Sequence, residues 1–148
     1  MRVVLQRVSE ARVRVDGRVV GEIGPGLLLL CAFAPADDEA VLRWMAAKCA
    51  DLRVFNDDEG KMNRSLRDTG GGALAVSQFT LYGDCRKGRR PSFVHSAPPE
   101  RAAALYERFL ELLGAEGLTV AAGVFQAMMA VELINDGPVT LVLEREAP

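Results

Sequence analysis

A run of seven apolar residues, Leu27 to Phe33, constrains the fold of this chain more than any other stretch. A strand with one face in water alternates polar and apolar residues, whereas a strand buried on both faces is continuously apolar. The run therefore predicts a central strand of a sheet. Ala73 to Val76 predicts another buried strand.

The N-terminal part of the chain predicts a β-hairpin. Ala11, Val13 and Val15 alternate with two arginines, as expected for a strand with one polar face. Asp16-Gly17 is typical of a two-residue turn, so the return strand is expected at Arg18–Ile23. Further short strands are predicted at Leu52–Phe55, Leu118–Ala122, Met128–Ile134 and Val139–Leu143.

Two segments carry apolar residues at helical spacing. The first begins at Asp37-Asp38-Glu39 and presents Val41, Trp44, Met45, Cys49 and Leu52 on one face. The second begins at Pro98-Pro99-Glu100, ends at Gly114, and presents Ala102, Leu105, Tyr106, Phe109, Leu112 and Leu113. Residues 1–148 are expected to form a single domain. We predict a mixed α/β fold: a largely antiparallel sheet or open barrel of about eight strands, with two main helices on one side.

Composition excludes several classes of function. A net charge of −2 argues against a protein that wraps long nucleic acid, although not against one that grips a few nucleotides. Three widely spaced cysteines form neither a disulfide framework nor a zinc motif, and the single His95 makes a Ser-His-Asp triad improbable. We expect no metal and no cofactor. The apolar runs are too short to span a bilayer and no signal peptide is recognised, so a soluble, cytoplasmic protein is expected.

Three stretches could carry chemistry. Ser77 to Tyr82 follows a buried strand, and its hydroxyls, amide and free N–H groups could surround a reacting carbonyl. Cys85 to Phe93 contains four basic residues beside an aromatic, which suits a phosphate backbone. Gly123 to Met129 could hold a flat base by stacking and sulfur contact. Each has an ordinary alternative: a strand end, a solvated charge run and hydrophobic core, respectively.

A fourth stretch, Asn135 to Thr140, lies between two apolar runs. Its composition, Asn-Asp-Gly-Pro, favours a hairpin loop. Gly137-Pro138 can also adopt a cis peptide bond at a cost of about 0.5–1 kcal/mol, far less than a non-proline bond. A cis Gly-Pro turns backbone groups outward without a Cβ, so the stretch could instead touch a ligand.

These stretches occur together and in this order in bacterial D-aminoacyl-tRNA deacylases, and the sequence resembles that family over essentially its whole length. The matching motifs are Gln6-Arg7-Val8, Gly21-Glu22-Ile23-Gly24, Gly26-Leu27, Gly60-Lys61-Met62-Asn63, Ser77-Gln78-Phe79-Thr80-Leu81, Arg90-Pro91-Ser92-Phe93, Gly123 with Phe125 and Met129, and Asn135-Asp136-Gly137-Pro138-Val139-Thr140. The Ser-Gln-Phe-Thr and Asn-Asp-Gly-Pro-Val-Thr pair is specific in combination. Met128 departs from the pattern, since related sequences often carry a polar residue there.

The resemblance implies a homodimer that hydrolyses the ester bond of D-aminoacyl-tRNA, and also glycyl-tRNA attached to the wrong tRNA. It implies that Gly137 and Pro138 enter the partner subunit's site and exclude L-amino acids. Site residues follow in two groups. Those expected to line the ester are Ser77, Gln78, Phe79 and Thr80, and those expected to hold the terminal adenosine are Gly123, Phe125 and Met129. From charge alone, we expect Arg86, Lys87, Arg89 and Arg90 to meet the acceptor phosphates.

Thr80 has the chemistry of a nucleophile, yet no histidine, lysine or carboxylate lies near it in sequence to activate it. The resemblance implies help from the 2′-hydroxyl of the substrate, with Thr80 as a positioning residue. Two other functions remain open: a tRNA-end binding module without catalysis, and a generic esterase that uses Thr80. His95 matches no family motif and receives no role.

Overall fold

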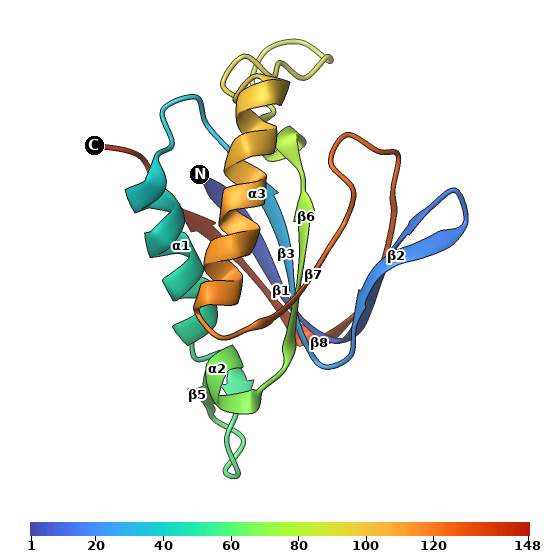
Figure 1. Ribbon diagram of the computed structural model, residues 1–148, viewed down its shortest axis with the longest axis vertical. Helices are drawn as coiled ribbons and strands as arrows, with labels where there is room; N and C mark the ends of the chain where they lie inside the picture. Colours follow the sequence, from blue (N-terminus) through green and yellow to red (C-terminus); the bar gives the residue numbers. More distant parts are fainter.

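The computed structural model describes residues 1–148 as a twisted, nearly closed sheet with helices on one face (Figure 1). The strands are β1 (Arg2–Val15), β2 (Arg18–Ile23), β3 (Gly26–Ala32), β4 (Phe55–Asn56), β5 (Met62–Arg64), β6 (Gly72–Ser77), β7 (Thr119–Ala122) and β8 (Ala130–Glu144). The helices are α1 (Glu39–Asp51), α2 (Leu66–Thr69) and α3 (Pro99–Ala115), with a 3-10 helix η1 (Phe79–Tyr82). None of these helices is both long and apolar enough to cross a membrane.

Six strands form the main sheet, in the order β2-β1-β3-β6-β7 with β8 also paired to β1. The β3–β6 and β6–β7 pairs are parallel and the others are antiparallel. The long β1 pairs with β3 through its first half and with β2 through its second half, while β8 follows it along the other side. The sheet nearly closes because Gly21, which has no side chain, lets β2 approach the Ala122 carbonyl in β7.

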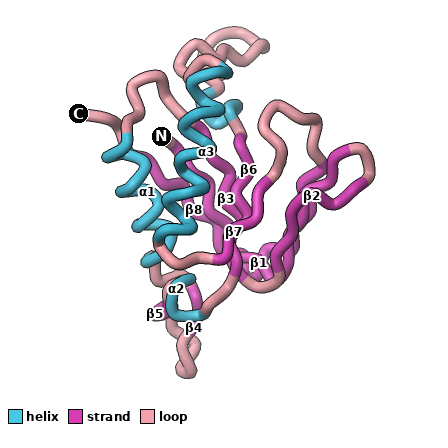
Figure 2. The backbone as a smooth tube through the Cα atoms, in the orientation of Figure 1, coloured by secondary structure: helices cyan, strands magenta, loops and turns pink.

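Helices α1 and α3 pack side by side over one face of the sheet (Figure 2). Beneath them lies the main core, which includes Leu27 and Leu29 of β3 and Phe109 of α3. On the opposite face Leu28 belongs to a smaller core with Val76. The prediction that the Leu27 run forms a central buried strand is therefore confirmed. The acidic residues correctly predicted the start of α1, and Asp38 caps the helix by accepting a hydrogen bond from the Val41 N–H.

The mixed α/β class is confirmed, but the arrangement differs from the prediction in two ways. The main sheet has six strands rather than about eight, because β4 and β5 form a separate two-stranded ribbon. A third helix, α2, was not predicted. It is short and is held by a capping box between Ser65 and Asp68, an arrangement with no apolar period to reveal it.

The prediction of a hairpin loop at Asn135 to Thr140 is wrong. Both flanking runs belong to one strand, β8, which pairs with β1 from Ala130 to Glu144. Val8 of β1 faces Asn135 and Gln6 faces Thr140, so four residues of β8 bulge out opposite the single Arg7. Turn-forming residues need not end a strand when the neighbouring strand continues past them. Here β1 is long enough to pair with β8 on both sides of the bulge.

Candidate active site

The carboxyl ends of three parallel strands bring two of the predicted stretches together. In β6, Ser77 faces Cys31 of β3, and Ala75 faces Ala122 of β7. The Gln78 N–H continues this pairing by donating to the Cys31 carbonyl at 2.7 Å. Ser77–Thr80 and the segment that starts at Gly123 therefore leave the sheet at the same edge, the usual place for a site in parallel α/β structures.

The Ser77–Thr80 segment turns from β6 directly into η1. The Gln78 side-chain amide donates to the Thr80 hydroxyl oxygen at 2.5 Å. The Thr80 carbonyl accepts from the Gly83 N–H at 2.9 Å, which closes the turn. The N–H groups of Phe79 and Thr80 lie at the start of this helix, where no intrahelical acceptor exists. They are thus available to a substrate oxygen, whereas the Thr80 side chain has only an amide, and no base, as its hydrogen-bond partner.

Arg2 fastens this helix to the sheet, a role that no local sequence pattern indicated. Its guanidinium donates to the Leu81 carbonyl at 3.0 Å and lies 4.5 Å from the centre of the Tyr82 ring. Glu144 of β8 holds the same guanidinium through a 2.8 Å hydrogen bond. Burial raises the pKa of the Tyr82 phenol, so the ring stays neutral under its cation.

The Gly123 segment forms a partly apolar wall beside Ser77. The Gly123 N–H and the Tyr106 hydroxyl both donate to the Ala75 carbonyl, at 3.1 and 2.8 Å. Phe125 packs against the Tyr106 ring at 6.0 Å, and a Cβ on Gly123 would lie 2.7 Å from the Met129 sulfur. Phe125 and Met129 are each half-buried against a hydrophobic core. Part of each side chain therefore belongs to the core, which was the alternative to a base-binding role.

Only three of the four basic residues predicted to meet phosphates are free. Arg86 is held by Asp84 through hydrogen bonds of 2.9 and 2.6 Å, which keep the pKa of that carboxyl well below its usual range. Lys87, Arg89 and Arg90 are exposed and form no ion pair. They lie on a loop closed by backbone hydrogen bonds between Asp84 and Ser92.

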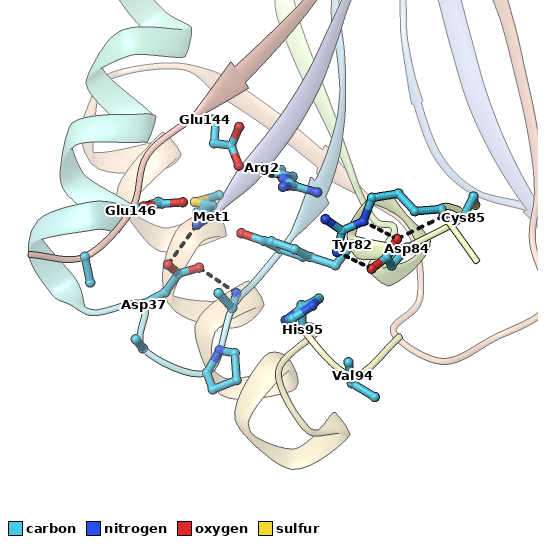
Figure 3. A pocket seen from close by; sticks show the side chains of 16 residues that line it. Met1, Arg2, Asp37, Tyr82, Asp84, Cys85, Val94, His95, Glu144 and Glu146 are labelled. Atoms are coloured by element: carbon cyan, nitrogen blue, oxygen red, sulfur yellow. Dashed lines mark hydrogen bonds and ion pairs between the residues drawn. The ribbon is translucent and has the colours of Figure 1, made fainter. Parts of the chain in front are cut away.

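An open cavity of about 850 Å³ lies behind η1 but contains none of the predicted ester or adenosine residues (Figure 3). Tyr82 and His95 line it together with four carboxyl side chains: Asp37, Asp84, Glu144 and Glu146. Three of these carboxylates already have a cation, since Asp37 pairs with the Met1 amino group, Asp84 with Arg86 and Glu144 with Arg2. We therefore assign no chemistry to this cavity.

Arg7 organises the Asn135–Thr140 bulge. Its buried guanidinium donates to the Asp136 carbonyl at 2.7 Å and to the Val54 carbonyl at 2.8 Å. The Gly137–Pro138 peptide within the bulge is cis, and both residues are exposed. Gly137 has a φ of +145°, and a Cβ there would lie 2.9 Å from the Val139 nitrogen and 3.1 Å from Arg7. The position accepts only glycine without local displacement.

The bulge lies far from the Ser77–Thr80 segment of the same chain. Arg7 is level with Leu27 of β3, whereas Ser77 is level with Cys31, four residues further along. That offset is about 13 Å along the strands, before the spacing between strands is added. Figure 1 shows the same separation, with the β4–β5 ribbon and η1 at opposite ends of the molecule. One chain alone does not join the Gly137–Pro138 motif to the predicted ester residues.

Comparisons with known proteins agree over nearly the whole chain. A family model described as D-Tyr-tRNA(Tyr) deacylase matches residues 4–144. A D-aminoacyl-tRNA deacylase of Symbiobacterium thermophilum is 58% identical over 99% of this chain and 97% of its own length. The enzyme of the same name from Pelobacter propionicus is 57% identical over 98% of this chain and 100% of its own.

Two solved structures are also similar. A c-Myc DNA Unwinding Element Binding Protein superimposes with a TM-score of 0.93 at 40% identity, covering 99% of this chain and 100% of that one. A probable eukaryotic D-amino acid tRNA deacylase superimposes with a TM-score of 0.81 at 22% identity, covering 96% and 97%. At 22% sequence identity, the similarity to the second structure shows a shared fold and nothing about function.

Proposed function

The chain belongs to the D-Tyr-tRNA(Tyr) deacylase family, and from that membership we propose that it hydrolyses the ester between a D-amino acid and the 3′ end of tRNA. Free tRNA and the free D-amino acid are the products. The whole chain, residues 1–148, acts as one domain in the cytoplasm. The observation that carries the proposal is the convergence of the Ser77–Thr80 and Gly123–Met129 segments at one sheet edge.

Hydrolysis proceeds by addition of water to the ester carbonyl carbon and departure of the ribose 3′ oxygen, which takes up a proton. The N–H groups of Phe79 and Thr80 stabilise the negative charge that develops on the carbonyl oxygen. The 2′-hydroxyl of the terminal ribose assists proton movement, because no protein base contacts Thr80. Thr80, oriented by Gln78, positions the substrate rather than attacking it. Ser77 completes the wall around the ester.

Gly123, Phe125 and Met129 hold the terminal adenosine. Phe125 and Met129 are only half-buried, so each keeps apolar surface that a base can cover. A side chain on Gly123 would displace the Met129 sulfur. Further along the tRNA, Lys87, Arg89 and Arg90 face the acceptor phosphates, and Arg86 contributes less because Asp84 neutralises it.

Selection of the D-substrate is assigned to Gly137 and Pro138, acting across a homodimer. The separation of this motif from Ser77–Thr80 within one chain, together with its exposure, supports insertion into the partner's site. There the backbone holds the substrate's α-amino group and leaves no space for an L side chain. Glycine has no side chain to exclude, so glycyl-tRNA is a substrate as well.

The proposal is tested by incubating the protein with matched D-tyrosyl-, L-tyrosyl- and glycyl-tRNA. We expect hydrolysis of the D-tyrosyl and glycyl esters and protection of the L-tyrosyl ester. A binding module without catalysis would cleave none of the three. A generic esterase would cleave D-tyrosyl esters equally well without the tRNA.

The cross-subunit arrangement has its own test. A heterodimer is prepared from one subunit with Gly123→Leu, which fills the adenosine site, and one with Gly137→Ala, which alters the inserted motif. If each site takes its motif from the other subunit, one of the two sites then carries both changes and the other carries none. We expect about half of the wild-type activity, whereas a heterodimer as inactive as both parent variants would contradict the arrangement.

A further inference from the structure

Two aromatic rings are exposed together at the edge of the candidate active site. Phe79 is 53% exposed and Phe93 is 37% exposed. Their ring centroids are 5.1 Å apart at an interplanar angle of 70°, an edge-to-face contact that leaves much of both rings uncovered. Neighbouring Val94 is also exposed. Large apolar side chains gathered on a surface typically mark a binding site.

The pair is held in place by its surroundings. Phe79 belongs to η1, and Phe93 directly follows Ser92, which hydrogen bonds to Asp84 in both directions at 2.7 and 3.0 Å. The Phe93 ring lies over Gly83, where a Cβ would come within 3.1 Å of it. A ring that is fixed before its ligand arrives loses little conformational entropy on binding.

The charge beside the rings indicates the chemistry of the ligand. Lys87, Arg89 and Arg90 are exposed on the loop that connects η1 to Phe93, and none of them is neutralised by a carboxylate. Exposed aromatic rings bordered by unpaired cations are the pattern by which proteins bind single-stranded nucleic acid, with bases stacked on the rings and phosphates near the cations.

We propose that the Phe79–Phe93 pair stacks the base of an unpaired nucleotide immediately upstream of the terminal adenosine. The inference rests on the proposed function, because Phe79 adjoins Thr80 and the adenosine itself is assigned to Gly123, Phe125 and Met129. The strand then runs from the adenosine site over the rings toward Lys87, Arg89 and Arg90. The single-stranded end, and not the ester alone, is thus part of what the enzyme recognises.

The test compares two substrates that differ only in the upstream nucleotides: the D-tyrosyl ester of adenosine and that of the trinucleotide cytidylyl-cytidylyl-adenosine. For Phe93→Ala we expect kcat/KM on the trinucleotide ester to fall about 5- to 150-fold, the range for loss of one base–aromatic stack. The change appears in KM, and the adenosine ester is hydrolysed as by the wild type. Phe93→Tyr retains a ring and restores the trinucleotide rate, and Val19→Ala, which truncates an exposed apolar side chain on β2, serves as the control.

Equal losses on both esters, or no loss on either, would overturn the inference. So would conversion of the Phe93→Ala dimer to monomer in size-exclusion chromatography, because the rings would then belong to an interface between subunits. Equilibrium binding of the trinucleotide without an attached amino acid tests stacking on the Phe79–Phe93 pair independently of hydrolysis. If the trinucleotide binds more tightly than adenosine, and Phe93→Ala abolishes this difference, base stacking on the Phe79–Phe93 pair is supported. That conclusion would hold even if neither D-ester were cleaved, a result that would refute only the proposed function.

Discussion

Replacing Arg7 with methionine tests whether the Gly137–Pro138 motif depends on a buried guanidinium. Methionine keeps most of the apolar stem of Arg7 but loses its donors to the Asp136 and Val54 carbonyls, at 2.7 and 2.8 Å. A hydrogen bond to a charged group contributes about 1.5–3 kcal/mol, so the two together predict a loss of about 3–6 kcal/mol in the free energy of unfolding. The Asp136 carboxylate is 3.9 Å away and exposed, so it adds little.

The assay has two readouts. Urea denaturation is compared at matched protein concentration, because the stability of a dimer depends on concentration. Hydrolysis of D- and L-tyrosyl-tRNA is measured under conditions in which the variant remains folded. We expect lower stability together with weaker discrimination, and Arg7→Lys, which keeps the charge but not the fork of donors, should fall between. A stability loss below about 1 kcal/mol with unchanged discrimination would refute the role assigned to Arg7.

Four further predictions have defined outcomes. Gly137→Ala should impair D-tyrosyl-tRNA hydrolysis or admit the L-substrate while the protein stays folded, since a Cβ there meets Val139 and Arg7; unaltered activity and selectivity would contradict the motif's role. Thr80→Val and Thr80→Ala should lower turnover by less than about 10³-fold, or ~4 kcal/mol, and a larger loss with a trapped acyl-threonine would identify a nucleophile. In the native protein a thiol reagent should label only Cys85, because Cys31 and Cys49 are buried. Burial raises the pKa of Cys49 to about 12 from 9.0, so above pH 9 the unfolded thiol loses its proton and the folded one does not. The unfolding free energy should then fall with rising pH, by about 1.4 kcal/mol per unit for this thiol. Cys49→Ala should show a slope shallower than the wild type by that amount but not flat, because burial also raises the pKa of the Cys31 thiol.

The spacing of apolar residues predicted those elements that keep the same face, or both faces, buried along their whole length. The apolar run at Leu27 became β3, and the stripe from Ala102 to Leu113 became the inner face of α3. The same local signals failed at Asn135–Thr140, because turn-forming residues look alike in a hairpin and in a bulge. The difference lies in β1, a partner more than 120 residues away in sequence that pairs on both sides of the bulge.

Side chains that act over long sequence separations were missed for the same reason. Arg2 reaches Leu81 and Glu144, and Arg7 reaches Val54 and Asp136, none of which is near it in sequence. The neutralisation of Arg86 could have been foreseen, since Asp84 is only two residues away. The sequence correctly predicted that the Ser-Gln-Phe-Thr motif follows a buried strand, but not that the motif enters a 3-10 helix.

We propose that this protein hydrolyses D-aminoacyl-tRNA and spares the L form by exclusion at the α-carbon. The most direct measurement is the ratio of kcat/KM for D-tyrosyl-tRNA to that for L-tyrosyl-tRNA, determined with the same tRNA preparation. We predict a ratio above about 10³, equivalent to ~4 kcal/mol of discrimination between the two transition states. A ratio near one, or no hydrolysis of either ester, would show that the protein does not select D-aminoacyl-tRNA in this way.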